Sequence, residues 1–435
     1  MIGLFQGAKI IVFPEYGVTG GMSLKDGEAV REAVYPYAEF VPSVSTCLGC
    51  TVPVGGSEAV STLACMAKTY QMYVVGNMIE RVTCSPGVKG CRPDGQFLYN
   101  TNVVFNQTGC LVAKYHKFAM WAEENYRLDH PAQPEYVYFD TEFGRFGTEV
   151  CFDLMFKYPG LPLVQKYDID TMLFPTYWPV LNSYVSFISN VIQFSSGWAR
   201  RMHVNFLAAD VHSQRDRAIG SAISTPESVV ASYCDWKSNQ GRLLVADIPI
   251  NTSKNRSKTE KVEEVKVDEF RDYGWFPALN VTDLQDFVFK EITGLTGMAQ
   301  VCSHQLCCSA NYTRRDNSNF IVIGARASKG NKILPFDYEV CVVRKCKSPD
   351  LMSCLDMFDT ESTTYFDKLT LSGKFSVDYV YPAVTLANNE YTGVKFDFHY
   401  QGFYNELNVT EMHSPLLTAA LISYTYDPSL QSHNI

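Results

Sequence analysis

The chain has 435 residues, 46% of them hydrophobic and 19% charged, which is enough to bury one large core and a smaller one. The net charge is −9 and the lysines and arginines form no basic stripe, which argues against nucleic acid as a partner. No stretch approaches the roughly 18 consecutive apolar residues of a membrane span, and residues 1–7 lack the basic start and apolar run of a secretory leader, so we expect no transmembrane segment and no leader.

The first strong pattern is a short apolar run followed by proline. Residues 8–13, Ala-Lys-Ile-Ile-Val-Phe, are rich in β-branched side chains and predict a buried parallel strand. Pro14 cannot continue a strand ladder, so Glu15 lies just past the carboxyl end of the strand. Ligands bind at this edge in open α/β sheets, which makes Glu15 a candidate site residue.

Strands and helices alternate over the following residues. Apolar side chains at helical spacing predict a helix at 57–70, and β-rich runs predict a strand at 72–77 and a hairpin of 99–105 with 110–116. Residues 136–150 are again strand-rich, with a turn near 142–144. The pattern then predicts a helical stretch from 153, a strand with a proline at 171–175, a long buried helix at 184–202, and core strands at 204–210 and 243–248. This alternation over the first ~250 residues predicts an α/β layered domain.

The composition changes after residue 250. Lys, Glu, Asn, Ser and Thr dominate residues 251–269, which predicts a solvated linker or a long surface loop. Beyond it, alternating apolar and polar runs predict a β domain held by disulfides, with strands near 319–324, 338–343, 368–371 and 418–424.

Cysteines and glycosylation sequons point to the secretory pathway. The chain has fourteen cysteines, and Cys84 and Cys91 flank a Pro-Gly loop that predicts a disulfide between them. Dense cysteines together with six Asn-x-Ser/Thr sequons predict a secreted, extracellular glycoprotein. The six candidate glycosylation sites are Asn106, Asn251, Asn255, Asn280, Asn311 and Asn408.

Three short segments carry the residue types that amide hydrolysis needs. Cys151 follows a β-like run and precedes a helix-like one, a position at which a neighbouring base or cation and a helix N-terminus would favour the thiolate. Glu15 supplies a base and Lys117 a cation. Taken singly, each has an ordinary structural explanation: a core thiol, a helix cap and a surface lysine.

Together these segments resemble a known family. Pro14-Glu15, Tyr115-His116-Lys117 and Cys151-Phe152-Asp153 resemble, in order and approximate spacing, the Glu-Lys-Cys triad of the nitrilase superfamily. The segments that resemble its vanin (pantetheinase) and biotinidase branch include Leu63-Ala-Cys-Met-Ala-Lys68, Tyr99-Asn-Thr101, Phe174-Pro-Thr-Tyr-Trp178 and, in the tail, Val301-Cys-Ser-His-Gln-Leu-Cys-Cys308.

The resemblance implies a fold. We expect a nitrilase-like α-β-β-α sandwich over residues 1–262, followed by a smaller, disulfide-rich, vanin-type β domain over residues 263–435. By the same comparison, the family's first strand and most of its first helix are missing before residue 1.

The resemblance also implies roles for individual residues. Cys151 is the nucleophile, Glu15 the general base, and Lys117 the cation that stabilises the tetrahedral intermediate. The backbone N–H of Phe152 completes the oxyanion hole, and Glu124 resembles the second carboxylate that orients the lysine or the base. The implied substrate is a small-molecule secondary amide, cleaved through a thioester with no metal and no organic cofactor.

Two residues depart from the family pattern. Glu149 replaces an apolar residue two positions before Cys151, and strand alternation predicts that it points to the face of the nucleophile. There it would raise the pKa of the thiol or contact the substrate. Tyr177 replaces a small residue before Trp178, so we expect Tyr177 and Trp178 to line a narrowed substrate pocket.

Several alternatives accompany this interpretation. If Cys151 has a free thiol, thirteen cysteines remain, so at least one more must be unpaired if all bridges are internal, and Cys65 on the apolar face of the predicted helix is the candidate. Cys47-Leu-Gly-Cys50 has zinc-ligand spacing without a second pair, and Gly-x-Ser-x-Gly does not occur. Pantetheine and biotinyl amides remain open as substrates, as does a non-catalytic binding or adhesion glycoprotein on the same scaffold.

Overall fold

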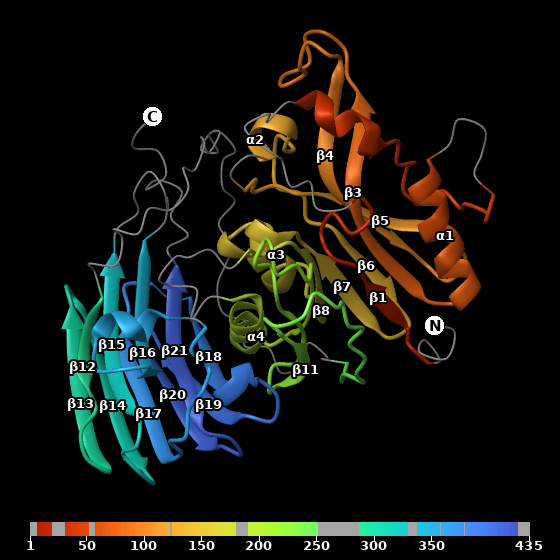
Figure 1. Ribbon diagram of the computed structural model, residues 1–435. Helices are drawn as coiled ribbons and strands as arrows, with labels where there is room; N and C mark the ends of the chain where they lie inside the picture. Colours follow the sequence, from red (N-terminus) through yellow and green to blue (C-terminus); the bar gives the residue numbers. More distant parts are fainter. Residues whose placement is uncertain are drawn as a thin grey trace. The chain divides into compact units, whose positions relative to one another are not determined.

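The computed structural model describes residues 7–19, 31–51, 57–121, 124–179, 190–250, 287–328, 337–356, 358–377 and 379–424 (Figure 1). These residues form two compact units. Of the described residues, the first unit takes those within 7–178 and 207–212 together with Ile250, and the second takes those within 179–206, 213–249 and 287–424. Each unit therefore contains segments that are distant in the sequence.

The first unit begins with a mixed sheet. In chain order its strands are β1 (Ile10–Val12), β2 (Ala38–Glu39), β3 (Tyr73–Thr83), β4 (Gln96–Phe105) and β5 (Leu111–His116). They lie in the order β1-β3-β4-β5, with β2 also pairing with β3; β1 and β2 run parallel to β3, and β4 is antiparallel to both neighbours. The predicted strand before Pro14 and the predicted hairpin are confirmed.

The predicted helix at 57–70 is also confirmed, as α1 (Glu58–Tyr70). Its buried Val60, Leu63, Ala64 and Ala67 pack in one hydrophobic cluster with core residues of β3 and β4. Gly76 on β3 allows this close packing, because a Cβ added there would lie 2.6 Å from the Leu63 side chain. One face of the first sheet is thus covered by a helix.

The second sheet of this unit contains β6 (Tyr138–Thr141), β7 (Gly144–Thr148), β8 (Thr171–Thr176) and β9 (Asn205–Asp210), in the order β6-β7-β8-β9. It packs on the first sheet through a shared apolar cluster of Tyr73, Val75, Val104 and Ala113 with Phe139, Phe146 and Leu173. On its outer side a Cβ at Gly147 would meet Leu163 of α3 (Gly160–Gln165), so a helix covers this face too. The result is the expected α-β-β-α sandwich, with the 3-10 helices η2 (Arg31–Tyr37) and η3 (Cys151–Met155) and the short helix α2 (Glu124–Arg127) in its connections.

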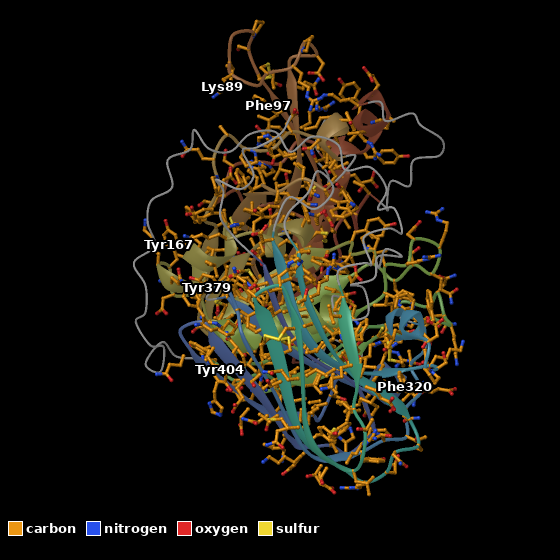
Figure 2. All side chains as sticks on the ribbon, turned by 90° about the vertical axis from the view of Figure 1, so that its left-hand side faces the viewer. Lys89, Phe97, Tyr167, Phe320, Tyr379 and Tyr404 are labelled. Atoms are coloured by element: carbon orange, nitrogen blue, oxygen red, sulfur yellow. A yellow bond between two sulfur atoms is a disulfide. The ribbon has the colours of Figure 1, made fainter. Side chains whose placement is uncertain are left out.

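The second unit contains two five-stranded antiparallel sheets. Their orders are β12-β15-β16-β21-β18 and β13-β14-β17-β20-β19, and apolar side chains from both sheets share one core cluster. The strands are β12 (Val288–Glu291), β13 (Thr296–Ser303), β14 (Leu306–Arg314), β15 (Phe320–Ser328), β16 (Tyr338–Cys346), β17 (Phe366–Lys374), β18 (Val380–Leu386), β19 (Lys395–Gln401), β20 (Tyr404–Glu411) and β21 (Leu416–Tyr424). Phe320 and Tyr404, labelled in Figure 2, begin one strand of each sheet. The 3-10 helices η7 (Leu351–Leu355) and η8 (Ala387–Asn389) lie between the strands in sequence, and the predicted β-rich tail is confirmed.

A helix from the middle of the chain belongs to this second unit. Helix α4 (Val191–Met202) packs against β18, where a Cβ at Gly197 would lie 2.7 Å from the carbonyl oxygen of Pro382. The Gln193 side chain also donates to Thr385 Oγ1 at 2.8 Å. The hairpin of β10 (Ser221–Ser224) and β11 (Val229–Tyr233) lies in the same unit.

Two predictions of secondary structure need correction. The long helix is predicted from residue 184, but Asn190 has extended backbone and caps α4 by accepting from the Gln193 N–H at 3.0 Å. Residues 184–189 of that prediction lie outside the described residues. The strand predicted at 243–248 is wrong, because residues 241–250 form no ladder and Leu243 and Val245 are 41% and 58% exposed.

Six disulfides join twelve of the fourteen cysteines. They are Cys47–Cys110, Cys50–Cys65, Cys84–Cys91, Cys302–Cys307, Cys308–Cys341 and Cys346–Cys354. Cys151 and Cys234 take part in none of them. The prediction that Cys65 is unpaired is wrong: Cys65 lies beside the buried stripe of α1 rather than within it, and so reaches Cys50.

Candidate active site

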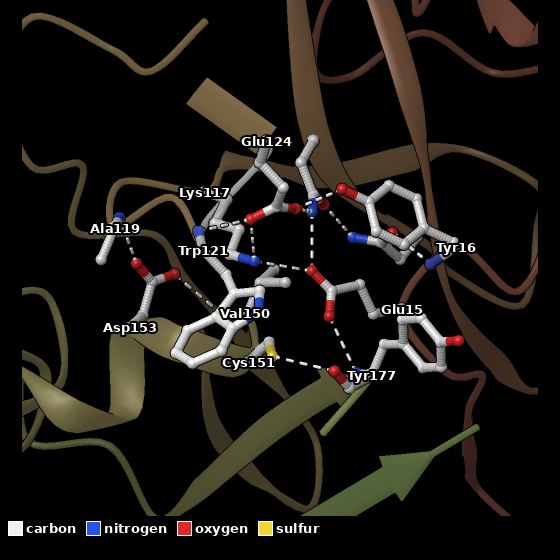
Figure 3. A network of polar contacts seen from close by, with 12 residues as sticks. Glu15, Tyr16, Lys117, Ala119, Trp121, Glu124, Val150, Cys151, Asp153 and Tyr177 are labelled. Atoms are coloured by element: carbon white, nitrogen blue, oxygen red, sulfur yellow. Dashed lines mark hydrogen bonds and ion pairs between the residues drawn. The ribbon is translucent and has the colours of Figure 1, made fainter. Parts of the chain in front are cut away.

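The site is built where strands of both sheets of the first unit end. Glu15 follows β1, Lys117 follows β5, and Cys151 follows β7 as the first residue of η3. Although β1 and β5 are not adjacent in the first sheet and β7 belongs to the second, their ends bring together three side chains that are far apart in the sequence (Figure 3). The three are 1%, 1% and 6% exposed, respectively.

Lys117 lies between two carboxylates. Its Nζ is 2.8 Å from Glu15 Oε1 and 2.7 Å from Glu124 Oε2. Burial alone favours the neutral amine, but Glu124 and Glu15 raise the pKa of Lys117 well above its ordinary value. The lysine is therefore a buried ammonium ion held by two acids.

The two carboxylates have opposite pKa shifts. Burial, the largest cause, raises the pKa of Glu15; Lys117 opposes this effect and the Glu124 charge adds to it. For Glu124, burial also acts to raise the pKa, but Lys117 and the donors around the carboxylate outweigh it and lower the pKa. Glu124 is thus the more acidic counter-ion of Lys117, and Glu15 is the more basic of the two carboxylates.

Further donors hold Glu124 in place. It accepts the backbone N–H of Trp121 at 2.7 Å and a short hydrogen bond from the Tyr16 hydroxyl. Tyr16 is not a candidate from the sequence, because a tyrosine next to the candidate base carries no signal of its own. The structure shows that it anchors the second carboxylate.

Cys151 has a strained backbone. Its φ is +45°, a left-handed value that L residues with a Cβ rarely adopt, after extended Val150. The Sγ atom lies 3.5 Å from the carbonyl oxygen of Tyr177, to which the thiol donates. The Tyr177 N–H in turn donates to Glu15 Oε2 at 2.8 Å, so the backbone of one residue contacts both the base and the nucleophile.

The expectation of a resting thiolate at Cys151 needs correction. Burial, followed by the Glu15 charge, raises the pKa of the thiol well above its ordinary value, and Lys117 only partly opposes this effect. The segment after Cys151 is also a five-residue 3-10 helix rather than an α-helix with a strong dipole. These surroundings favour the neutral thiol of Cys151 over the thiolate.

Asp153 braces the turn that carries Cys151. Its Oδ2 accepts from the Tyr115 hydroxyl at 2.8 Å and from the Val150 N–H at 3.0 Å, and its Oδ1 accepts from the backbone N–H groups of Phe118 and Ala119 at 3.2 and 2.7 Å. One buried carboxylate therefore joins the nucleophile turn to the segment after Lys117. The sequence places Asp153 in the Cys-Phe-Asp motif without indicating a role for it.

Replacing Asp153 by asparagine is expected to lower kcat/KM by about 100-fold, because an amide NH₂ would face backbone donors and displace the nucleophile turn. Steady-state kinetics of the variant would check this. Asp140→Asn is the matched control, since the Asp140 side chain is 64% exposed and pairs with Arg145. A D153N enzyme with unchanged kcat/KM would contradict the bracing role.

The remaining predicted site residues have different surroundings. The Phe152 ring stacks edge-to-face on Trp121 at a centroid distance of 4.8 Å. Trp178 donates its backbone N–H to Asp210 Oδ1 at 2.9 Å and packs beside Cys151, and the Tyr177 ring packs in an apolar cluster that contains Tyr16. All three surround the strand ends near the nucleophile.

The Glu149 side chain joins none of these contacts. It is fully buried, and neither carboxyl oxygen has a hydrogen-bond partner among the described residues. Burial, followed by the Asp153 charge, raises its pKa well above the ordinary value. Gly147, two residues earlier, faces α3, and alternation places Glu149 on the same side. Alternation does not extend to Cys151, because the backbone turns there at positive φ.

Two family models and several curated relatives match this chain. Residues 4–256 match the model of the carbon-nitrogen hydrolase family, and residues 276–429 match the vanin C-terminal domain. Mouse pantetheinase is 34% identical over 433 residues, covering 97% of this chain and 80% of the mouse protein. Human pantetheinase is 33% identical, and the match covers 98% of this chain and 82% of the human protein. Biotinidase of Takifugu rubripes is 31% identical, and the match covers 87% of this chain and 77% of the biotinidase.

The family match and the named relatives define a hydrolase that acts on carbon-nitrogen bonds of amides. The chain belongs to the carbon-nitrogen hydrolase family of the nitrilase superfamily, in the vanin and biotinidase branch that carries a vanin C-terminal domain. Among the described residues no helix is long and apolar enough to cross a membrane.

Proposed function

We propose that the protein hydrolyses the secondary amide of pantetheine to pantothenate and cysteamine. The observation that carries the proposal is the buried arrangement of Glu15, Lys117 and Cys151, in which a thiol, a base and a fixed cation meet. The choice of substrate is supported by relatives named pantetheinase that match nearly the whole chain.

The first half of the reaction forms a thioester. Glu15 takes the thiol proton as the Cys151 sulfur attacks the amide carbon, and the carbon-oxygen π electrons move to the oxygen. The Lys117 ammonium and the Phe152 N–H stabilise this oxyanion. Glu15 then gives its proton to the amine nitrogen, the carbon-nitrogen bond breaks, and cysteamine leaves.

The second half releases the acid. Glu15 takes a proton from water, the hydroxyl oxygen attacks the thioester carbon, and the sulfur leaves and regains a proton from Glu15. The raised pKa of Glu15 suits both transfers, since the group must gain and lose a proton in each half. The scheme uses only groups of this chain, without metal or organic cofactor.

A second candidate substrate is a biotinyl amide such as biocytin. It is supported by the similarity to biotinidase of Takifugu rubripes, at 31% identity over 407 residues. Both substrates present a secondary amide on a flexible acyl chain, so the same triad serves either one. We place pantetheine first because the pantetheinases match more of the chain at higher identity.

Purified protein is expected to release cysteamine from pantetheine, and Cys151→Ala is expected to abolish the release. The measurement is amine release from pantetheine and from biocytin, with Cys234→Ala as the control for loss of a thiol outside the catalytic unit. Preferred turnover of biocytin would select the second substrate. If neither amide is cleaved, the hydrolase proposal fails and the non-catalytic binding or adhesion role takes its place.

Secretion and glycosylation are proposed on separate grounds. Six disulfides support an oxidising compartment. Asn311 is exposed on β14, and Asn106 and Asn408 are partly exposed. The other three predicted sites, Asn251, Asn255 and Asn280, lie outside the described residues.

We also propose the domain limits 1–262 and 263–435. The two family matches cover residues 4–256 and 276–429. The proposed boundary falls between these two ranges, which supports the limits.

A further inference from the structure

Three asparagine side chains form a ladder inside the first unit. Asn77 lies on β3 and Asn100 and Asn102 on β4, and all three are 0% exposed. Buried amides cost free energy unless their donors and acceptors are paired, so three of them side by side require a network.

Asn77 is the centre of that network. Its Oδ1 accepts the Tyr16 backbone N–H at 2.7 Å. Its Nδ2 donates to Asn100 Oδ1 at 2.7 Å and to Asn102 Oδ1 at 2.9 Å. The Asn77 side chain thus connects the backbone of the residue after the general base with both asparagine side chains on β4.

The Asn100 end of the ladder reaches the catalytic carboxylates. Asn100 Nδ2 donates to Glu15 Oε1 at 2.7 Å and to Glu124 Oε1 at 3.1 Å. The Lys117 ammonium contacts the same two acids, so Asn100 supplies the second donor that they share.

The Asn102 end reaches the strand that leads to the nucleophile. Asn102 Nδ2 donates to Thr148 Oγ1 at 2.8 Å and to the carbonyl oxygen of Glu149 at 3.3 Å. Thr148 Oγ1 donates onward to the Leu173 carbonyl at 3.1 Å. Cys151 lies two residues after Glu149, so the contact is close to the nucleophile in sequence.

The direction of every amide in this ladder is fixed by groups that have one role. A backbone N–H only donates, so the oxygen of Asn77 faces Tyr16 and its NH₂ faces the two rungs. The oxygens of Asn100 and Asn102 must then face Asn77, which leaves the NH₂ of Asn100 for Glu15. If the oxygen and the NH₂ group of one amide exchanged places, its oxygen would face another oxygen acceptor at the next position in the ladder.

We propose that Asn77 is a positioning residue, which acts through Asn100 to keep an N–H donor on the Glu15 carboxylate and through Asn102 to fix the strand end before Cys151. This role rests on the proposed function, because Glu15 is the base of that reaction. The donated bond of Asn100 also lowers the pKa of Glu15, against the larger effect of burial.

The test is Asn77→Asp, which keeps the size of the side chain and replaces its donor by an acceptor. The Asn100 amide then turns its NH₂ toward the new carboxylate, and its oxygen faces Glu15. We expect the acid limb of the kcat/KM profile for pantetheine to move up by about one pH unit and kcat to fall by about tenfold or more. A purely structural role would leave the pH profile in place.

Asn405→Asp is the matched control. Asn405 is also 0% exposed, but it lies on β20 in the second unit and donates to the Phe403 carbonyl at 3.1 Å. We expect this change to lower Tm without moving the pH profile. A pH profile and kcat of Asn77→Asp that match those of the native enzyme, with only Tm reduced, would overturn the proposal.

Two additions keep the result decisive. If Asn77→Asp does not fold, Asn77→Ser removes the amide donors to Asn100 and Asn102 with a smaller perturbation. We then expect the acid limb of the kcat/KM profile to move in the same direction by a smaller amount. If the native enzyme cleaves no amide, alkylation of Cys151 by iodoacetamide, followed by mass spectrometry across pH, replaces turnover. If the midpoint pH of Cys151 alkylation is higher in the variant, the positioning role of Asn77 is supported. If the midpoint pH is unchanged, that role is rejected.

Discussion

Replacing Lys117 by methionine is expected to abolish amide hydrolysis and to lower the free energy of unfolding by about 3–5 kcal/mol. The catalytic loss follows because the fixed cation on the proposed oxyanion disappears. The loss of stability follows because Glu15 and Glu124 stay buried, at 1% and 13% side-chain exposure, without the ammonium that contacts both.

The measurement combines turnover with denaturant unfolding at pH 7. Lys114→Met is the matched control, since Lys114 on β5 pairs with Glu80 at 2.7 Å and its side chain is 20% exposed. Adding Glu124→Gln to Lys117→Met is expected to restore part of the stability and none of the activity. Turnover above one tenth of the native rate in K117M would contradict the role of the lysine.

Replacing Glu149 by methionine is expected to stabilise the protein by about 1–3 kcal/mol at pH 7, because a buried carboxyl with no hydrogen-bond partner in the described part of the chain gives way to an apolar chain of similar length. The gain depends on pH. The folded pKa of Glu149 is raised, so the folded state holds the proton more tightly, and native stability falls as pH rises from the unfolded pKa of about 4.3 toward the folded value. The advantage of the variant therefore grows over that range.

Thermal and denaturant unfolding at pH 5 and pH 7 would check this expectation. Glu361→Met, at an exposed position, is the control and is expected to leave the slope of stability against pH unchanged. An E149M protein that is no more stable than the native one would show that the carboxyl is paired in solution. A stable E149M protein without activity would instead assign Glu149 to substrate contact.

The sequence was sufficient for features that local patterns specify. Helical spacing predicted α1, alternation fits β5, and runs rich in apolar and β-branched residues predicted β3 and β4, which are buried on both faces over most of their length. The candidate triad was predicted because its members follow recognisable strand ends and resemble a family.

The remaining features depend on tertiary neighbours. Asn77 and Asn100 are ordinary polar residues in a strand pattern, and only the pairing of β3 with β4 aligns them into a ladder. Glu149 and Cys151 do not share a face because the backbone turns at Cys151 with a left-handed φ, which the alternation rule does not include. The Cys50–Cys65 bond depends on where one helix lies, and cysteine counting gave the number of unpaired thiols without their identity.

The packing of α4 on β18 has a consequence for synthesis of the chain. About 180 residues separate the end of α4 at Met202 from the end of β18 at Leu386, and they take about 10–40 seconds to translate. Until β18 emerges, the apolar face of α4, which includes Phe194, lacks the strand that covers it in the finished protein. A ribosome-bound chain that already contains Glu15, Lys117 and Cys151 thus still lacks the strand that covers this helix, and expression of residues 1–262 alone would leave that face without β18.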